Sequence, residues 1–492
     1  MTLASSCQQP QHLRARAGGW LFAALCALWL GACDAPRPVP VPTAHVHHYD
    51  VTLTLDAERA HLTGHARLAV TGGGDGLSLG FANLRVDSLR VNNQRVAYDQ
   101  RSDAIRITTG RSTRDTLMVD LWYVGAPHMG LNQETYAGER LVYTDGWPDE
   151  VRGWLPGTHH PARPATLDLT LVTPSDLEVI ASGVAVSQTR DAEERQTRWR
   201  LDAPVPTYAF GFAAGPFTTL SDTAQVAAGP LPVSLHLLTD PEPAAEALHR
   251  VPEAVAFFEE LLGPYPFASL AVVQLTHPYA GMEFAAMPTV QAGLFDAPGT
   301  LWTHTPESVA VHELAHQWVG NALSMADWRD LWLVEGMATY LTAWFYAHVA
   351  GEAVALEHLR ALHDGPSDHQ AAAPLYPENP VVPAAHLDRE LYNRGALVLH
   401  QLREEMGTAA FVALWQQLIE DARTTLLSTE RLEEAVASGA DVDAGTFFAT
   451  YVYGRTYPAV PDRLAPPEVL ETAAWHTADG PRYRRTMSPP AR

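Results

Sequence analysis

The stretch "VHELAHQWVGNALSMADWRDLWLVEGMATYL", residues 311–341, decides how the rest of the chain is interpreted. His312 and His316 are four residues apart, and helical residues at this spacing point from the same face. Two imidazoles on one face can bind one metal ion. Glu313 lies one step round the helix, where its carboxylate can reach a water on the metal without being a ligand. The helix is predicted to end near Gly320.

A third ligand is available on the next predicted helix. Glu335 follows His316 by nineteen residues. Two histidines and one carboxylate leave a fourth position for water, which is the arrangement of catalytic zinc sites. The alternative is a chance pattern on a solvated helix face, in a chain that has 22 histidines. The zinc interpretation predicts one Zn²⁺ per chain, bound by His312, His316 and Glu335.

The spacing and several other segments resemble one peptidase family. "HELAHQW" followed by "LWLVEGMATYL" is similar to the gluzincin zinc metallopeptidases of the aminopeptidase N family, whose motif is HExxH, eighteen residues and Glu; residues 317–334 are eighteen. "YAGMEFAAMPTV" (279–290) resembles the GxMEN exopeptidase motif of that family. "LYNRGALVLHQL" (391–402) resembles the segment that carries its catalytic tyrosine. With "VRGWLPGTHHPARPATLDLTLVTP", which resembles its N-terminal β-domain, the match covers roughly residues 45–460.

The resemblance implies a role for each site residue. Glu313 would be the general base for a metal-activated water, and Tyr392 would donate a hydrogen bond to the developing oxyanion. Glu283 would bind the free α-ammonium of the substrate. The backbone of Gly281 and Met282 would pair with the extended peptide. The implied activity is that of a zinc-dependent aminopeptidase acting on peptides with a free N-terminus.

Three residues depart from the family pattern and keep other activities open. Phe284 replaces the usual Asn, and Arg394 replaces the usual Lys. Trp147 stands where the family often has Gln or Glu that helps to bind the substrate amine. A zinc endopeptidase or an epoxide hydrolase on the same fold is therefore an alternative, to be separated by assays on free and N-blocked peptides. A catalytically inactive binding module is the alternative from another class, against which the intact site residues argue.

The fold class follows from a change of hydrophobic period along the chain. From residue 45 to about 217, segments such as "YDVTLTLDA" alternate with period two, and after residue 240 apolar residues recur at helical spacing, first in "AAEALHRVPEAVAFFEELLG". We predict a multidomain α+β chain. Its domains are an N-terminal antiparallel β-sandwich-like domain (45–218), a thermolysin-like, mainly helical zinc peptidase domain (219–461) and a tail (462–492), without a large C-terminal helical domain.

The N-terminus has the features of an export signal. Basic residues precede the apolar run "GGWLFAALCALWLGAC", which ends in "LGAC", a resemblance to the lipobox of bacterial lipoproteins. We predict a lipoprotein signal peptide (1–32), a lipid-modified Cys33 and a Pro-rich tether (33–44). This would place an exported protein on the periplasmic or cell-surface face of a bacterial membrane. An ordinary signal peptide that ends in cysteine is the alternative.

The charge of the chain excludes one class of partner. A formal net charge of −23 would repel phosphate groups, so nucleic acid is not expected to bind. The expected partners are peptide substrates and, through the lipid, a membrane. The sequence indicates no oligomeric state.

Overall fold

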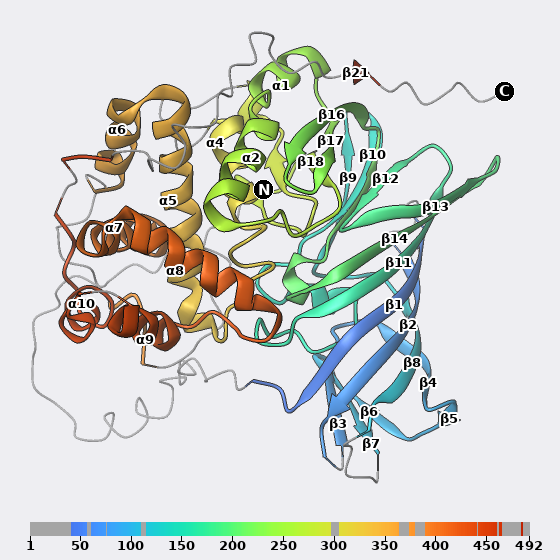
Figure 1. Cartoon of the computed structure of the whole chain (residues 1–492). Helices are drawn as coiled ribbons and strands as arrows, with labels where there is room; N and C mark the ends of the chain where they lie inside the picture. The colour runs from blue at the N-terminus through green and yellow to red at the C-terminus, as the bar shows by residue number, and fades with distance from the viewer. Residues whose placement is uncertain are drawn as a thin grey trace, which may run out of the picture. The chain divides into compact units, whose positions relative to one another are not determined.

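An eight-stranded sheet forms the largest part of the first half of the chain (Figure 1). Its strands run in the order β13 (Val184–Arg190), β14 (Glu194–Val205), β11 (Ala165–Pro174), β1 (Ala44–Asp56), β2 (His61–Gly72), β8 (Leu117–Gly125), β4 (Arg85–Val91) and β5 (Gln94–Arg95). Buried residues alternate along β1 and β2, with Val51, Leu53 and Leu55 facing the core. The period-two pattern of the sequence is therefore one face of this sheet.

The structure is a computed structural model of the chain. It describes residues 41–56, 61–74, 76–109, 115–296, 305–363, 373–378, 389–439, 441–459, 462–464 and 484–485. The predicted signal peptide and Cys33 lie outside the described residues, as do most of the predicted tether and tail. The boundary predicted at residue 218 stays a prediction.

One pairing in the large sheet differs from the predicted antiparallel arrangement. β1 and β11 are parallel, with Val51 opposite Leu169, whereas the other described pairs of this sheet are antiparallel. The two strands are far apart in sequence, because strands β2, β4, β5 and β8 of the same sheet lie between them along the chain. Alternation of apolar residues reports which face is buried and is the same for both directions of pairing.

Two smaller antiparallel sheets accompany the large one. One has the order β12 (Glu178–Ala181), β15 (Phe212–Gly215), β10 (Glu139–Thr144) and β9 (Leu131–Tyr136); the other has β3 (Gly76–Gly80), β7 (Ala104–Thr108) and β6 (Tyr98–Gln100). Aromatic rings join the layers: Tyr49 of β1 packs edge-on against Phe210 at 5.7 Å, and Trp154 against Phe212 of β15 at 5.5 Å. The predicted sandwich-like packing is confirmed.

A six-stranded mixed sheet begins after β15. Its order is β19 (Gly281–Met282), β20 (Thr289–Gln291), β18 (Leu270–Leu275), β17 (Gly229–Leu237), β16 (Thr218–Val226) and β21 (Arg484–Arg485). β18 lies between two parallel neighbours and is buried along its whole length, which explains its continuous apolar sequence. β19 is an edge strand, so one side of its backbone is unpaired within the described sheet.

Helices form the other half of the molecule, as predicted (Figure 1). They are α1 (Pro241–Ala247), α2 (Val251–Leu262), α3 (Gly293–Asp296), α4 (Pro306–Ala315), α5 (Leu331–Ala350), α6 (Glu352–His363), α7 (Arg389–Met406), α8 (Thr408–Glu420), α9 (Thr429–Gly439) and α10 (Ala444–Tyr451), with short 3-10 turns η1 (Glu150–Gly153), η2 (Thr207–Ala209), η4 (Trp328–Asp330) and η5 (Asp421–Arg423). The helical spacing in "AAEALHRVPEAVAFFEELLG" corresponds to two helices, α1 and α2, and Pro252 lies in the first turn of α2.

Helix α5 lies among α4, α6 and α7, and it crosses α7 at two glycines (Figure 1). A Cβ on Gly336 would lie 2.7 Å from the backbone carbon of Gly395, and one on Gly395 would lie 2.9 Å from the carbonyl oxygen of Trp332. No side chain fits between these backbones. The close crossing brings Glu335, next to the first glycine, near Tyr392, one turn before the second.

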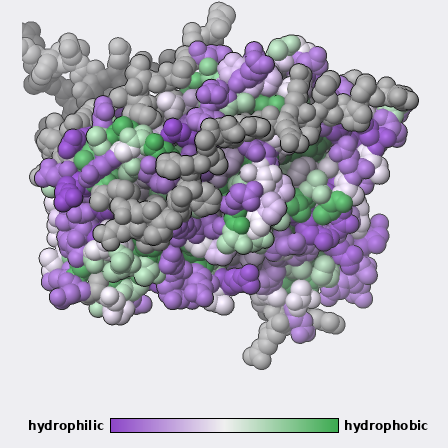
Figure 2. Space-filling model, turned by 45° about the horizontal axis from the view of Figure 1, so that its top comes forward, coloured by the Kyte–Doolittle hydropathy of each residue, from purple (hydrophilic) through white to green (hydrophobic). Residues whose placement is uncertain are grey.

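The face of the molecule in Figure 2 is mainly hydrophilic over the described residues, and hydrophobic residues occur there in small separate groups. Within the described part of the chain, no helix combines the length and apolarity needed to span a bilayer.

Candidate metal centre and substrate cavity

The two histidines of the HExxH motif come from the last turn of α4. Thr305 caps its N-terminus in a capping box with Ser308. The helix ends at Ala315 with His316 as its C-cap, earlier than the predicted end near Gly320. The helical conformation nevertheless continues through His316, so both imidazoles still point the same way.

His312, His316 and Glu335 meet at one point, as predicted for metal ligands. The two Nε2 atoms are 3.1 Å apart, and each lies 3.4 Å from Oε2 of Glu335. Ligands about 2.0 Å from a tetrahedral ion are separated by roughly 3.3 Å. The three atoms therefore have the spacing of three corners of a zinc coordination sphere.

The charges around this group also fit a cation. Burial alone would lower the pKa of His316, but the carboxylate of Glu335, together with Glu283 and Glu313, raises that pKa to about 10. Oε2 of Glu335 is buried and makes no hydrogen bond of good geometry among the described residues. Burial alone would raise the pKa of Glu335, but the two histidines hold that pKa at about 2, so this buried group is a charged carboxylate that a divalent ion would stabilise.

His316 is oriented by the turn that follows it. Its Nδ1 lies 3.2 Å from the carbonyl oxygen of Val319, which can only accept a hydrogen bond. Nδ1 therefore carries a proton, and Nε2, which faces His312 and Glu335, is the nitrogen that would bind a metal.

Glu313 lies directly against the edge strand β19. An added Cβ on Gly281 would lie 2.4 Å from Oε1 of Glu313 and 2.6 Å from the Val309 side chain. Gly281 is thus required by close packing, in addition to its predicted role in pairing with peptide. Burial raises the pKa of the Glu313 carboxyl, as expected for a proton-accepting group held out of water.

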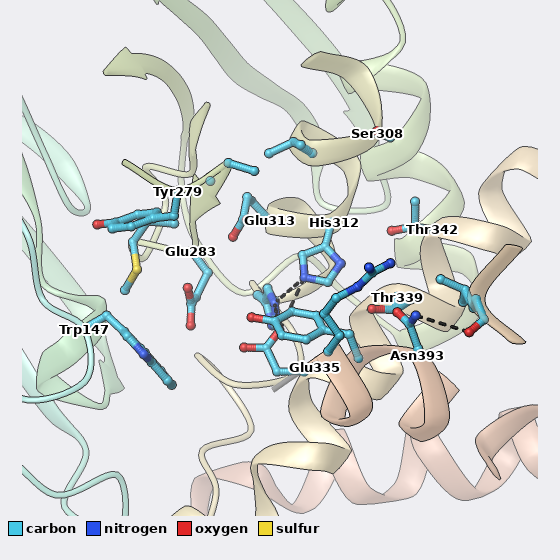
Figure 3. A pocket seen from close by; sticks show the side chains of 18 of the residues that line it. Trp147, Tyr279, Glu283, Ser308, His312, Glu313, Glu335, Thr339, Thr342 and Asn393 are labelled. Carbon is cyan, nitrogen blue, oxygen red and sulfur yellow. Dashed lines mark hydrogen bonds and ion pairs between the residues drawn. The ribbon is translucent and has the colours of Figure 1, made fainter. Parts of the chain in front are cut away.

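The carboxylate of Glu283 points into the same cavity from the other side (Figure 3). Its backbone carbonyl accepts a hydrogen bond from Nδ2 of Asn321 at 2.7 Å. The backbone N–H of Ala286, which has a φ of +59°, donates to Oε1 of Gln317 at 2.8 Å. Two side chains that follow the HExxH motif therefore hold the loop that presents Glu283. Burial raises the pKa of Glu283 to about 7.

Tyr392 completes the predicted site. It comes from the first turn of α7, and its ring centroid lies 5.9 Å from that of His312. Burial and the charges of Glu335, Glu283 and Glu313 raise the pKa of its hydroxyl, so it remains a hydrogen-bond donor at neutral pH.

The predicted site residues line one cavity of about 420 Å³ (Figure 3); they are Gly281, Met282, Glu283, His312, Glu313, His316, Glu335 and Tyr392. Its walls come from the β-domain loop at Trp147, the 279–283 segment, and helices α4, α5, α6 and α7. The wall residues that the sequence did not single out are Tyr279, Ala280, Ser308, Val309, Thr339, Thr342, His358, Leu362, Arg389 and Asn393.

The three departures from the family pattern have different structural consequences. Trp147 lines the cavity and packs edge-on against Tyr208 at 5.4 Å and Trp328 at 5.5 Å. Phe284 is buried against the backbone of Gly211, where an added Cβ would lie 2.4 Å from its ring. Arg394 donates hydrogen bonds to the carbonyl oxygens of three residues, Ala373, Tyr451 and Gly454. Only Trp147 alters the cavity itself.

A comparison with known protein families finds a match in the second half of the chain. Residues 246–451 match the profile described as the Peptidase family M1 domain. The chain therefore contains a region similar to the peptidase family M1 domain. This confirms the resemblance to the aminopeptidase N family of zinc metallopeptidases, and Zn²⁺ is the metal expected for the group of His312, His316 and Glu335.

Three proteins to which the chain is similar illustrate the match. Glutamyl aminopeptidase of Rattus norvegicus is 24% identical over 73% of this chain and 40% of its own length. The structure of an M1 zinc metallopeptidase from Deinococcus radiodurans, bound to a Tyr-Ser-Ala substrate, is 28% identical, with a TM-score of 0.73 over 85% of this chain and 96% of that one. A two-domain M1 zinc metallopeptidase solved with L-tryptophan is 27% identical, with a TM-score of 0.74 over 87% and 99%.

The chain spans 40%, 38% and 32% of the lengths of the first curated relatives it matches. The two-domain M1 structures, in contrast, are matched over nearly their whole length. The predicted fold class, a β-rich domain followed by a mainly helical peptidase domain, is confirmed.

Proposed function

We propose that the protein is a zinc aminopeptidase, which hydrolyses the first peptide bond of peptides that have a free N-terminus. One observation carries the proposal: Glu283, Glu313, Tyr392 and the group of His312, His316 and Glu335 all line the same cavity. A metal group with an adjacent carboxylate supports hydrolysis. A second buried carboxylate a short distance away supports recognition of an ammonium group.

Substrate binding would begin at Glu283 and β19. The α-ammonium of the substrate would pair with the Glu283 carboxylate, and the peptide backbone would pair with the open edge of Gly281–Met282. Trp147 offers only an N–H donor, so it does not replace a carboxylate, but its ring can add a cation–π contact to the ammonium. The amine is thus fixed at one end, and only the first peptide bond reaches the metal group.

The chemical step would use the residues around that bond. Zinc, when bound, lowers the pKa of a water molecule and polarises the scissile carbonyl. Glu313 accepts the proton of the attacking water and returns it to the leaving amine. The Tyr392 hydroxyl donates a hydrogen bond to the carbonyl oxygen as negative charge develops on it. His316 is kept in the ligand tautomer by the Val319 carbonyl.

Changing Glu283→Gln is expected to remove most of the preference for a free amine. The neutral amide keeps the size of the side chain but not its charge, and a hydrogen bond to a charged group contributes enough for roughly a 10- to 100-fold rise in KM. The measurement is kcat/KM for a tripeptide and for its N-acetylated form, with wild type and variant.

The matched control is Glu434→Gln, since Glu434 is exposed on α9, outside the cavity wall. It should retain the wild-type preference. An unchanged preference in Glu283→Gln would remove Glu283 from amine recognition. Equal cleavage of both peptides by wild type would favour a zinc endopeptidase, and hydrolysis of an epoxide without peptide cleavage would favour an epoxide hydrolase. No reaction with zinc-loaded protein would favour an inactive binding module.

We further propose that the protein is exported and lipid-anchored through Cys33, on the periplasmic or cell-surface side of a bacterial membrane. The support is the sequence "LGAC" after an apolar run, followed by a Pro-rich segment. Changing Cys33→Ala is expected to shift the protein from the membrane to the soluble fraction when cells are fractionated. Membrane association that persists in this variant would contradict the anchor.

A further inference from the structure

The cavity has a second end, which the proposed mechanism does not use. Figure 3 shows Trp147, Tyr279 and Glu283 on one side of the metal group, and Thr339, Thr342 and Asn393 on the other side. If Glu283 holds the substrate amine, the residue after the scissile bond must extend toward this second end. Its side chains would then contact the leaving part of the substrate.

His358 is the most unusual residue of this end. It lines the cavity from α6 and is only 4% exposed, yet neither of its ring nitrogens has a hydrogen-bond partner among the described residues. Leu362, one turn later on the same face of α6, accepts a hydrogen bond from Nδ2 of Asn393 at 3.2 Å through its carbonyl oxygen. This contact places the cavity face of α6 beside Asn393. A buried imidazole without a partner is costly unless a ligand satisfies it.

Arg389 adds a positive charge to the same end. It begins α7, one turn before Asn393, and it is the only lysine or arginine among the described residues that line the cavity. Its side chain is exposed, and no ion pair of Arg389 is found within the described part of the chain. In a protein of formal charge −23, a cavity-lining arginine that makes no ion pair among the described residues is available to bind an anionic ligand.

We propose that Arg389 and His358 form a subsite for a carboxylate on the leaving part of the substrate. A guanidinium and an imidazole N–H are both donors, and Thr339, one turn after Glu335 on α5, adds a hydroxyl to the wall. The carboxylate would be either the side chain of an Asp or Glu residue that follows the scissile bond or the C-terminus of a dipeptide. This inference rests on the proposed aminopeptidase function.

Four dipeptide substrates test the subsite: Leu-Glu amide, its isostere Leu-Gln amide, Leu-Ala with a free C-terminus, and Leu-Ala amide. For wild-type, zinc-loaded protein we expect kcat/KM to be about 10-fold or more higher for the carboxylate member of at least one pair, as for other charge-assisted hydrogen bonds. A preference within the first pair assigns the subsite to an acidic side chain. A preference within the second pair assigns it to the C-terminus.

Variants of Arg389 and His358 then test whether these residues cause the preference for a carboxylate. Arg389→Gln and His358→Phe should each lower the ratio of kcat/KM between the carboxylate substrate and its neutral counterpart toward one. The control Arg360→Gln changes an exposed arginine on α6 outside the cavity wall, and it should keep the wild-type ratio. Zinc content and thermal unfolding of each variant show whether it is folded. Arg389 is exposed, so its variant keeps the test valid if the buried His358 variant does not fold.

Two results would overturn the subsite: equal cleavage within both pairs by wild type, or a ratio that Arg389→Gln leaves unchanged. In either case Leu-Gln amide is still cleaved, and the aminopeptidase function stands. If none of the four dipeptides is cleaved, the proposed function and the subsite fail together.

Discussion

Replacing Glu313 with glutamine is expected to lower kcat by roughly 10²- to 10⁴-fold, the usual contribution of a general base. The amide has nearly the same shape, so it should still pack against Gly281, where the space is too small for another side chain. It cannot accept a proton from water. The loss should therefore fall on kcat, with KM and zinc content near their wild-type values.

Steady-state kinetics on a free-amine peptide and metal analysis of the same preparation measure this effect. Glu434→Gln, on the exposed face of α9, is the matched control and should have wild-type kinetics. Full activity in Glu313→Gln would remove this residue from the mechanism. A loss of zinc in the variant would instead assign Glu313 to the metal group.

Replacing His316 with alanine is expected to reduce zinc occupancy from one ion per chain to a small fraction and to abolish activity. His316 is buried, and its Nε2 contacts both His312 and Glu335. The remaining two donors cannot complete a stable tetrahedral site, and loss of even an outer-sphere partner costs about 10- to 100-fold in zinc affinity. We expect a larger loss for a direct ligand.

Zinc content after dialysis against a metal-buffered solution measures this prediction. His128→Ala changes an exposed histidine and should retain one zinc per chain. Stoichiometric zinc in His316→Ala would show that the metal is bound elsewhere. A chelator should inactivate the wild-type protein, and added zinc should restore its activity.

The zinc ligands could be predicted from the sequence because two of them lie four residues apart in one helix. The separation of His312 and His316 fixes their common direction in any helix, and only Glu335 required knowledge of the family spacing. The structure confirms that these three side chains converge. Glu283 and Tyr392 were assigned by resemblance, and the structure places both in the same cavity, while their roles stay predictions.

The residues that sequence reasoning missed depend on contacts between distant segments. Gln317 and Asn321 directly follow the zinc motif, but their function becomes visible only when the loop at residues 283–286 lies against them. The sequence presents His358 as one more histidine on an amphipathic helix, and only the structure shows that its ring has no hydrogen-bond partner among the described residues. Arg389 follows an undescribed segment, and no motif marks it.

Errors in the predicted fold have similar causes. The parallel pairing of β1 with β11 joins strands more than a hundred residues apart, and alternation of apolar residues does not encode strand direction. The helical spacing before Gly263 does not show where α1 ends and α2 begins, although Pro252 lies in the first turn of α2. α4 ends at Ala315, and the turn that follows it brings the Val319 carbonyl to Nδ1 of His316, a contact that helical periodicity does not predict.

The central claim is that a zinc hydrolase site and an amine-binding carboxylate act together on one substrate. The most direct test is cleavage of one peptide in two forms, with a free and with an acetylated N-terminus, by zinc-loaded wild-type protein. We predict that residues are released one at a time from the free N-terminus and that the acetylated form is cleaved at least about 10-fold more slowly. Equal rates for the two forms, or cleavage within the chain of the blocked peptide, would contradict the account.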